Sequence, residues 1–397
     1  MNILSTLTAL AVILVPLAAV IKVQGTDVWY CHYVALFAMM VAGISAWLWR
    51  SNKAISSLII LSLLSFVFVT RFNSRSFLCL TQIILACISV YGISLFNAKQ
   101  RNKIKWAIIF LVFIQAIWVI LQYLNLDPIF SKICQGDGSR FVNNSVDDPV
   151  GFSGSANTIG IFFAITMPFV LARFPYLLPF SLFGLYCSKT SFAVLASFAG
   201  TVILYSRKNV NKLILLILLL TGIGYGYLVN VEKTPTISAI TEYLRGRTDP
   251  AKDVIRILNT GNITIQRDNV SKIISCNPIL GFGVGTFPQI FPWYVPESRF
   301  YNQRMDKYAH LHNDFIEFYF EFGWLGGFWL LFLLVKIAKD FWNMRKNKEA
   351  LVYISSITAY IVCALGTFPT HTAVAGMLLI VIYGMFEGVR RENGKIA

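Results

Sequence analysis

The chain has 397 residues, of which 56% are hydrophobic and 13% charged, and its mean hydropathy is +0.64. A soluble globular protein of this composition would expose too much apolar surface, so the composition excludes that class and indicates a polytopic membrane protein. The net charge of +15 is best explained by short basic loops between apolar segments, which is typical of cytoplasmic loops and not of nucleic-acid binding.

Apolar segments long enough to cross a bilayer, which takes about 20 residues, recur along the chain. They predict an all-α fold with about twelve transmembrane helices. The predicted spans are residues 3–21, 28–49, 54–70, 76–97, 106–125, 156–172, 175–188, 190–205, 212–229, 313–337, 350–367 and 373–389. Residues 3–21 are assigned as a span and not as a signal peptide, because they have no basic segment before them and no clear cleavage site.

Basic residues between the spans predict the topology. Arg390, Arg391 and Lys395 place the C-terminus in the cytoplasm, and an even number of spans puts the N-terminus on the same side. Counting back along the chain, four more basic segments also fall inside: residues 50–53, 99–105, 207–212 and 336–348.

Two long polar segments remain on the outer side, residues 126–155 and 230–311. The second has helix-like apolar spacing and is predicted to form a helical cap between spans 9 and 10. No internal repeat or separate soluble domain is detected, so residues 1–397 are predicted to form one membrane domain that contains this cap. Cys134 and Cys276 lie in the outer segments, and the sequence leaves open whether they form a disulfide.

Ionisable residues crowd the start of the tenth span, where His312 is followed by Asp314, Glu317 and Glu321. The hydrocarbon disfavours such groups, so their position at its edge suggests a chemical site. An imidazole can accept a proton from a hydroxyl near neutral pH, and carboxylates one and two turns along a helix can orient it. Two other interpretations stay open: an interfacial histidine satisfied by water, or a metal site of His310, His312 and Asp314.

Three cationic residues are candidate anion-binding groups. Lys189 lies at the outer end of a pair of spans, where an amine either holds a phosphate or reaches lipid headgroups. Arg267 and Arg140 lie in the outer segments, where the alternative is a solvated surface arginine. Gly281-Phe-Gly-Val-Gly285 is similar to a phosphate-binding loop but lacks its strand, helix and Lys-Ser/Thr, so a turn that packs the backbone tightly is the favoured interpretation.

Two motifs resemble those of a known superfamily. His312-Asn313, nine residues and then Gly323-Trp-Leu-Gly326 fit the pattern H-[N/S/Q]-x9-G-x-x-[G/T/Y]. The preceding Asn277-Pro-Ile-Leu-Gly-Phe-Gly-Val-Gly-Thr-Phe287 is similar to a stretch that the same proteins carry upstream of the histidine. Together with the span count and the large outer loop, these motifs resemble the O-antigen ligase, O-antigen polymerase and bacterial O-oligosaccharyltransferase superfamily.

The resemblance implies a multi-pass glycosyltransferase of the bacterial inner membrane that acts at the periplasmic face without a metal, a nucleotide or another cofactor. The implied donor is a glycan on undecaprenyl diphosphate. The acceptor is lipid A-core in ligases, another lipid-linked glycan in polymerases and a protein hydroxyl in oligosaccharyltransferases. A ligase is preferred here, with a polymerase as the alternative.

The resemblance also implies roles for individual residues. His312 is expected to act as the general base or to orient the substrate, and Asn313 to contact the substrate beside it. Gly323 and Gly326 are expected to be structural.

Lys189 and Arg267 are expected to bind the diphosphate, because charge that develops on the leaving group needs preorganised cations. Arg140 is expected to contact the substrate. Lys189 departs from the family, which tends to carry arginine there, and loses the bidentate fork. The second family arginine is expected at Ile263, and Arg267 lies one helical turn later. The alternative from another class is a transporter of lipid-linked sugars with His312 as a proton relay, but that class places ionisable residues near mid-span.

Overall fold

A computed structural model describes residues 2–18, 53–70, 74–124, 126, 151, 156–188, 190–205, 273, 275–291 and 313–394. Within these residues the secondary structure is helical and contains no strand. The predicted all-α class is therefore confirmed for the described part of the chain.

A helix lies at ten of the twelve predicted spans, and the other two, residues 28–49 and 212–229, are outside the described residues. The helices are α1 (Asn2–Ala18), α3 (Lys53–Leu64) with a π-helical turn η1 (Ser65–Val69), α4 (Ser74–Ile93), α5 (Ala98–Tyr123), α7 (Ala156–Arg173), α8 (Leu178–Ser188), α9 (Ser191–Tyr205), α14 (Phe287–Ile290), α16 (Asp314–Met344), α17 (Lys348–Ala364) and α18 (Ala373–Gly394). Short 3-10 turns occupy Pro175–Leu177 and Pro369–His371.

Three of the described helices are long and apolar enough to cross a membrane: Ser76–Ile93, Ala98–Tyr123 and Asp314–Met344. Helix α8 has 11 residues and is about 17 Å long, which is too short to cross the hydrocarbon core by itself. The total of twelve spans stays a prediction. So does the cap at 230–311, because most of it lies outside the described residues.

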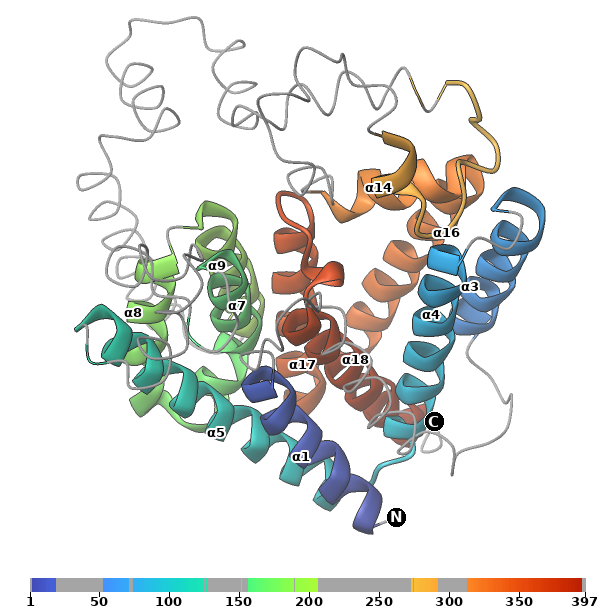
Figure 1. Cartoon of the computed structure of the whole chain (residues 1–397). Helices are drawn as coiled ribbons and strands as arrows, with labels where there is room; N and C mark the ends of the chain where they lie inside the picture. Colours follow the sequence, from blue (N-terminus) through green and yellow to red (C-terminus); the bar gives the residue numbers. More distant parts are fainter. Residues whose placement is uncertain are drawn as a thin grey trace, which may run out of the picture.

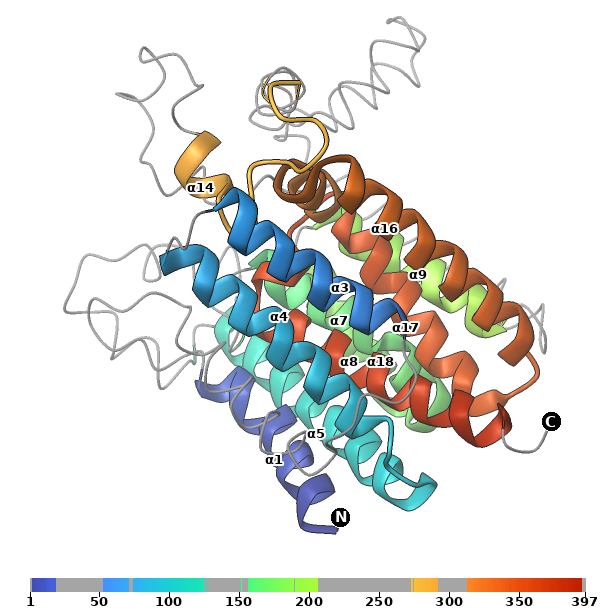
Figure 2. The ribbon, with the colours of Figure 1, turned by 90° about the vertical axis from the view of Figure 1, so that its right-hand side faces the viewer.

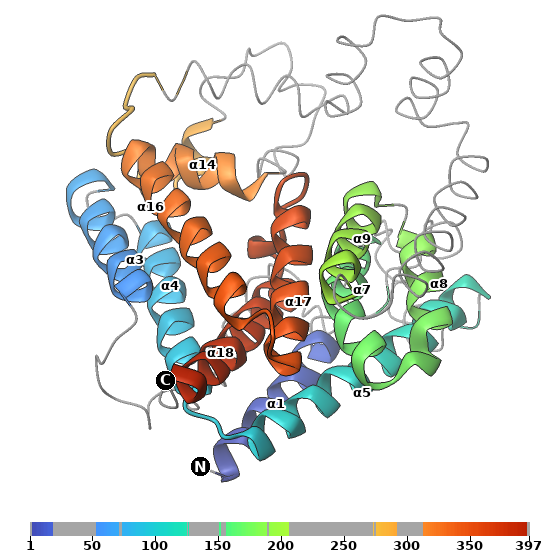
Figure 3. The same cartoon turned by 180° about the vertical axis from the view of Figure 1, so that it is seen from behind.

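The helices are arranged as a bundle with two groups on either side of α17 and α18 (Figure 1). On one side are α7, α8 and α9, and on the other are α16, α3 and α4 (Figures 1 and 3). Seen from the side, α3 and α4 run next to each other, and α1 runs along α5 (Figure 2). Close packing is helped by Gly200 of α9, where a Cβ would lie 2.8 Å from the backbone oxygen of Ser355 in α17.

The outer surface of the bundle is apolar, as a lipid-facing surface must be. On α5 the side chains of Trp106, Phe110, Phe113 and Ile117 follow one face of the helix and are 39–50% exposed. The opposite face of the same helix is buried in the core. Apolar residues therefore cover both faces of α5, which is the pattern of a helix that contacts protein on one side and lipid on the other.

Buried ion pairs hold the end of the bundle where α5 and α17 begin and α18 ends, called the basic end below. Arg101 is 1% exposed, and its guanidinium contacts Glu392 at 2.7 Å and Glu349 at 3.2 Å. Lys105 contacts the same oxygen of Glu349 at 2.7 Å. These contacts join α5, α17 and α18.

The predicted loop at 99–105 is wrong, because α5 begins at Ala98 and includes these basic residues. Asn97 and Gln100 form a capping box that starts the helix before its apolar part. Helix α16 likewise continues past the predicted end of its span, to Met344. Charged residues in both extensions have partners on α18: Arg101 contacts Glu392, and Asp340 lies 3.8 Å from Arg390.

Candidate functional site

Helix α16 is interrupted at Gly323. This residue has φ 60° and ψ −151°, a conformation that is essentially restricted to glycine, and the helix continues on both sides of it. An interruption leaves backbone N–H and C=O groups without partners inside the helix. Such groups are costly in a membrane unless other parts of the protein pair with them.

The segment Asn277–Gly283 supplies these partners. It lies against the interrupted part of α16, and backbone hydrogen bonds run in both directions between the two. The bonds are Phe282 N–H to Phe320 O (3.0 Å), Gly283 N–H to Glu321 O (2.8 Å), Trp324 N–H to Pro278 O (2.8 Å) and Leu325 N–H to Ile279 O (3.3 Å). The two sequence motifs therefore form one structural unit, in which each completes the backbone hydrogen bonding of the other.

Glycine is required at the contact between these two segments. A Cβ on Gly281, which has φ 66°, would lie 2.6 Å from the backbone carbonyl of Glu321. A Cβ on Gly323 would lie 2.5 Å from the backbone nitrogen of Gly281. The interpretation of Gly281–Gly285 as a tightly packed turn is therefore confirmed.

The other side of this turn contacts the π-helical end of α3. The N–H of Val284 donates to the hydroxyl of Ser65 at 3.0 Å. A Cβ on Gly283 would lie 2.2 Å from the methyl carbon of Thr70. The turn is thus held between α3 and α16.

The first turn of α16 is attached to the α17–α18 turn, which comprises residues 365–372. The side-chain oxygen of Asn313 caps α16 by accepting from Ile316 N–H at 3.0 Å, and its amide nitrogen donates to Leu365 O at 2.8 Å. One oxygen of Asp314 accepts hydrogen bonds from both the backbone N–H and the hydroxyl of Thr370. The residue that precedes Asn313 is His312, so these contacts fix the backbone next to the predicted catalytic histidine.

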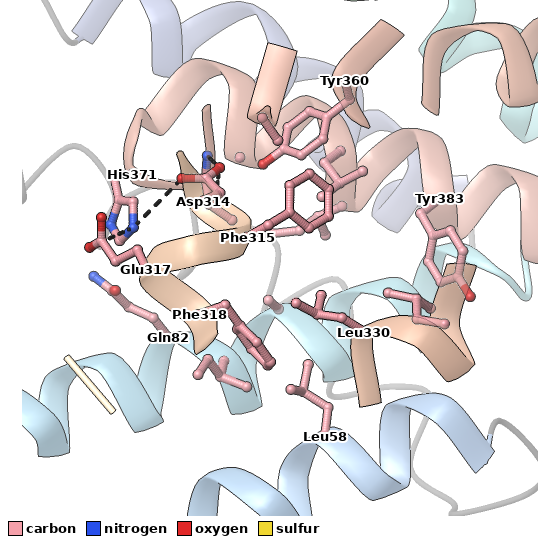
Figure 4. A pocket seen from close by; sticks show the side chains of 18 of the residues that line it. Leu58, Gln82, Asp314, Phe315, Glu317, Phe318, Leu330, Tyr360, His371 and Tyr383 are labelled. Carbon is pink, nitrogen blue, oxygen red and sulfur yellow. Dashed lines mark hydrogen bonds and ion pairs between the residues drawn. The ribbon is translucent and has the colours of Figure 1, made fainter. Parts of the chain in front are cut away.

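His371 of the same turn adds a contact between its imidazole and two acidic side chains. Its Nε2 lies 3.2 Å from Glu317 Oε1 and 3.8 Å from Asp314 Oδ1 (Figure 4). The side chains of Glu317 and Asp314 are 3% and 11% exposed, against 25% for His371. Two carboxylates one turn apart on α16 therefore face one imidazole.

A cavity of about 430 Å³ lies between α16 on one side and α3, α4, α17 and α18 on the other. Its polar lining comes mainly from residues near the first turn of α16, namely Gln82, Asp314, Glu317, Glu321, Thr370 and His371. The rest of the wall is mostly apolar and includes Leu58, Phe318 and Leu330, with Tyr383 at the far side from His371 (Figure 4). We call the polar part the mouth of the cavity.

This arrangement suits a molecule with a polar and an apolar part. The apolar wall can enclose a hydrocarbon chain, and the carboxylates and amide of the mouth can accept and donate hydrogen bonds. His371 is the one basic side chain among the described residues that line the cavity. Among the described residues, the mouth thus has three acidic side chains and one imidazole.

Of the predicted site residues, the structure describes Asn313, Gly323 and Gly326. Asn313 is bonded within the protein as given above, and a contact with substrate stays a prediction. Gly326 leaves room for an aromatic pair, because a Cβ there would lie 2.5 Å from the Cβ of Phe322 and 3.1 Å from the ring of Phe318.

The predicted catalytic His312 and the predicted cations Lys189, Arg267 and Arg140 lie outside the described residues. The same holds for His310 of the alternative metal site and for Cys134 of the alternative disulfide. Among the residues that the structure describes, no group of three His, Cys, Asp or Glu side chains is placed to hold a metal ion.

His371 is the site residue that sequence reasoning did not select. The available signal was its position, because residue 371 lies in the short outer turn between the spans predicted at 350–367 and 373–389. What the sequence could not show is that the turn before α18 folds against the first turn of α16, 57 residues earlier.

The helices and the apolar surface indicate a polytopic membrane protein, and its cavity combines an apolar wall with a polar mouth. Residues 176–331 match the family model described as O-antigen ligase. The match covers about two fifths of the chain and includes α8, α9, the Gly281–Gly285 turn and α16 as far as Leu331. It confirms the predicted resemblance to the O-antigen ligase superfamily over these residues and supports an O-antigen ligase- or polymerase-like function in general. No curated protein shows significant similarity to the chain.

Proposed function

We propose that the protein is an integral-membrane glycosyltransferase that moves a glycan from undecaprenyl diphosphate to an acceptor hydroxyl at the periplasmic face of the inner membrane. The acceptor in this proposal is lipid A-core, as in O-antigen ligases. The observation that carries it is the cavity of about 430 Å³, whose apolar wall ends in a polar mouth at the first turn of α16. His312 is two residues before Asp314 of that mouth.

The apolar wall would hold part of the polyprenyl chain of the donor, and the mouth would hold its sugar. A carboxylate such as Glu317 accepts hydrogen bonds from sugar hydroxyls and repels a diphosphate. The diphosphate is therefore expected beside the mouth and not within it.

The α8–α9 turn is proposed to bind the diphosphate, because the start of α9 contacts the α17–α18 turn to which His371 belongs. Phe192, at the start of α9, packs against Gly366 of the α17–α18 turn, where a Cβ would lie 2.0 Å from the ring. Lys189 belongs to the same α8–α9 turn, and Arg267 and Arg140 are the further proposed cations. Positive charge there would stabilise the leaving group as its negative charge develops.

In the proposed reaction, the acceptor hydroxyl oxygen attacks the anomeric carbon of the donor sugar. The bond between that carbon and the phosphate oxygen breaks, and its electron pair leaves with undecaprenyl diphosphate. His312 takes the hydroxyl proton, as a general base near neutral pH can. No metal or other cofactor takes part in this proposal.

The orientation in the membrane is supported by the charges. Arg101, Lys105 and Arg390 lie at the basic end of the bundle, opposite the mouth. Since basic residues are retained in the cytoplasm, the mouth would face the periplasm.

The test is transfer by the purified protein in liposomes that contain lipid-linked glycan and lipid A-core. The wild type is expected to form glycosylated lipid A-core, and His312→Ala is expected to form none while it folds normally. Full activity of His312→Ala would remove the proposed base. Product formed from two lipid-linked glycans in the absence of lipid A-core would instead indicate a polymerase. Movement of glycan across the bilayer without product would indicate a transporter.

A further inference from the structure

Helix α16 forms one wall of the cavity and is held at two places by charged contacts. Toward the basic end, Lys336 of α16 contacts Glu387 of α18 at 2.9 Å and Asp340 of its own helix at 2.8 Å. At the mouth, the first turn of α16 is attached to the α17–α18 turn. Between the two places α16 faces the cavity.

Three contacts attach α16 at the mouth: Asn313 to Leu365, Asp314 to Thr370, and Glu317 with Asp314 to His371. The first two are hydrogen bonds that involve no histidine. The third depends on an imidazole, whose charge changes near neutral pH. It is also the contact whose histidine, at 25% exposure, lines the cavity.

We propose that His371 is a positioning residue for the transfer reaction, which holds the first turn of α16, and with it His312, at the mouth of the cavity. This inference rests on the proposed function. Asn313 has an extended backbone conformation, with φ −157° and ψ 102°, directly before the helix. His312 is the residue before Asn313 in sequence, so the proposal makes its position depend on that of this turn.

The imidazolium form is the one that makes the contact strong. Asp314 and Glu317 are three residues apart on a helix and share one face. With an imidazolium 3.2 Å away, the poorly exposed carboxylate of Glu317 faces an opposite charge, and loss of the imidazolium proton removes this attraction. The other titratable groups that line this part of the cavity are Glu321 on α16 and Tyr360 on α17, and α4 contributes the neutral Gln82.

The charge of His371 and the charge of His312 should then act in opposite directions on the rate. A general base must be neutral, so loss of the His312 proton raises activity as the pH rises. The contact of His371 requires its proton, so activity should fall as the pH rises further. The wild type is expected to show a bell-shaped profile of kcat, in which His371 accounts for the alkaline side.

The test uses the full-length protein in liposomes with lipid-linked glycan and lipid A-core. His371→Ala is expected to lower kcat about ten- to a hundredfold, because a small misplacement of a reacting group has an effect of this size. The KM for the lipid-linked glycan should change little, since the apolar wall is intact. His371→Gln should recover part of the rate, because its amide N–H can still donate to Glu317, and should lack the alkaline fall.

A double-mutant cycle of His371→Gln with Glu317→Gln should show coupling, with the double variant less impaired than the product of the two single effects. The matched control is Lys105→Gln, which removes a buried ion pair at the basic end and should leave the pH profile unchanged.

The proposal is overturned if His371→Gln keeps the alkaline fall, or if the two substitutions act independently. It is also overturned if the activity of His371→Ala falls only as much as its amount of folded protein falls. Lys105→Gln is expected to behave in that way. Any of these results leaves the proposed function intact, provided that the wild type forms product and His312→Ala does not. Absence of product with the wild type would count against the proposed function itself.

Discussion

Replacing Gly323 with alanine tests whether the two motifs form one structural unit. Alanine at φ 60° and ψ −151° introduces backbone strain of about 1–3 kcal/mol. The new Cβ would also lie 2.5–2.6 Å from backbone atoms of Gly281, Ile279 and Pro278, which cannot move away as a flexible side chain could.

The expected cost follows from these contacts. Moving the 277–283 segment away from the Cβ weakens the hydrogen bonds from Trp324 to Pro278 and from Leu325 to Ile279, each worth about 1 kcal/mol. The sum is roughly 3–5 kcal/mol, a large part of the 5–15 kcal/mol that stabilises a typical protein. Because the effect is local, we expect the segment to detach from α16 while most of the bundle stays folded.

The measurements are thermal unfolding in detergent, limited proteolysis and transfer activity. Gly323→Ala should be cut more readily within residues 275–291, and its transfer rate should fall at least about tenfold. Gly327→Ala is the matched control, because Gly327 is helical and the nearest atom to its Cβ, in the ring of Tyr319, is 3.3 Å away. If both variants unfold, are cut and react alike, the proposed unit of the two motifs is refuted.

Two further substitutions test the cavity and the basic end. Ala86→Phe places a ring in the cavity and should raise the KM for the lipid-linked glycan several-fold in the liposome assay. The control Ala338→Phe, on the exposed face of α16, should leave this KM unchanged. Equal KM values for the two variants would exclude the cavity as the donor site. Glu349→Gln leaves the buried cations Arg101 and Lys105 with fewer partners, so it should destabilise the protein in thermal unfolding by roughly 3 kcal/mol. This value is the low end of the range for buried ion pairs, because Glu349 is 26% exposed. The exposed neighbour Lys348→Gln should have little effect, and similar unfolding of the two variants would contradict the role of this ion pair.

Much of the fold could be predicted because hydrocarbon imposes a simple requirement on the sequence. Long apolar segments must be helical in a bilayer, and they predicted helices at ten places where the structure has them. The ends of these helices were less accurate. Asn97 starts α5 earlier than the apolar pattern does, since a cap depends on local hydrogen bonds and not on hydropathy.

Part of the candidate site could also be predicted. The spacing of His312, Gly323 and Gly326 and the Gly281–Gly285 stretch indicated the superfamily that residues 176–331 match. The sequence did not show that Gly281 and Gly323 are in contact. The contact depends on the interruption of α16 at Gly323, whereas the apolar pattern predicts one continuous helix there.

The sequence by itself therefore determined the class of protein, most of its helices and the motifs that indicate its family. Tertiary structure alone decided that Glu317 and Asp314 face His371 and that an apolar cavity begins there. The physical reason is that hydropathy and helix periodicity act between neighbours in sequence. The partners of a buried charge or of an interrupted backbone instead depend on how segments far apart in the chain pack together.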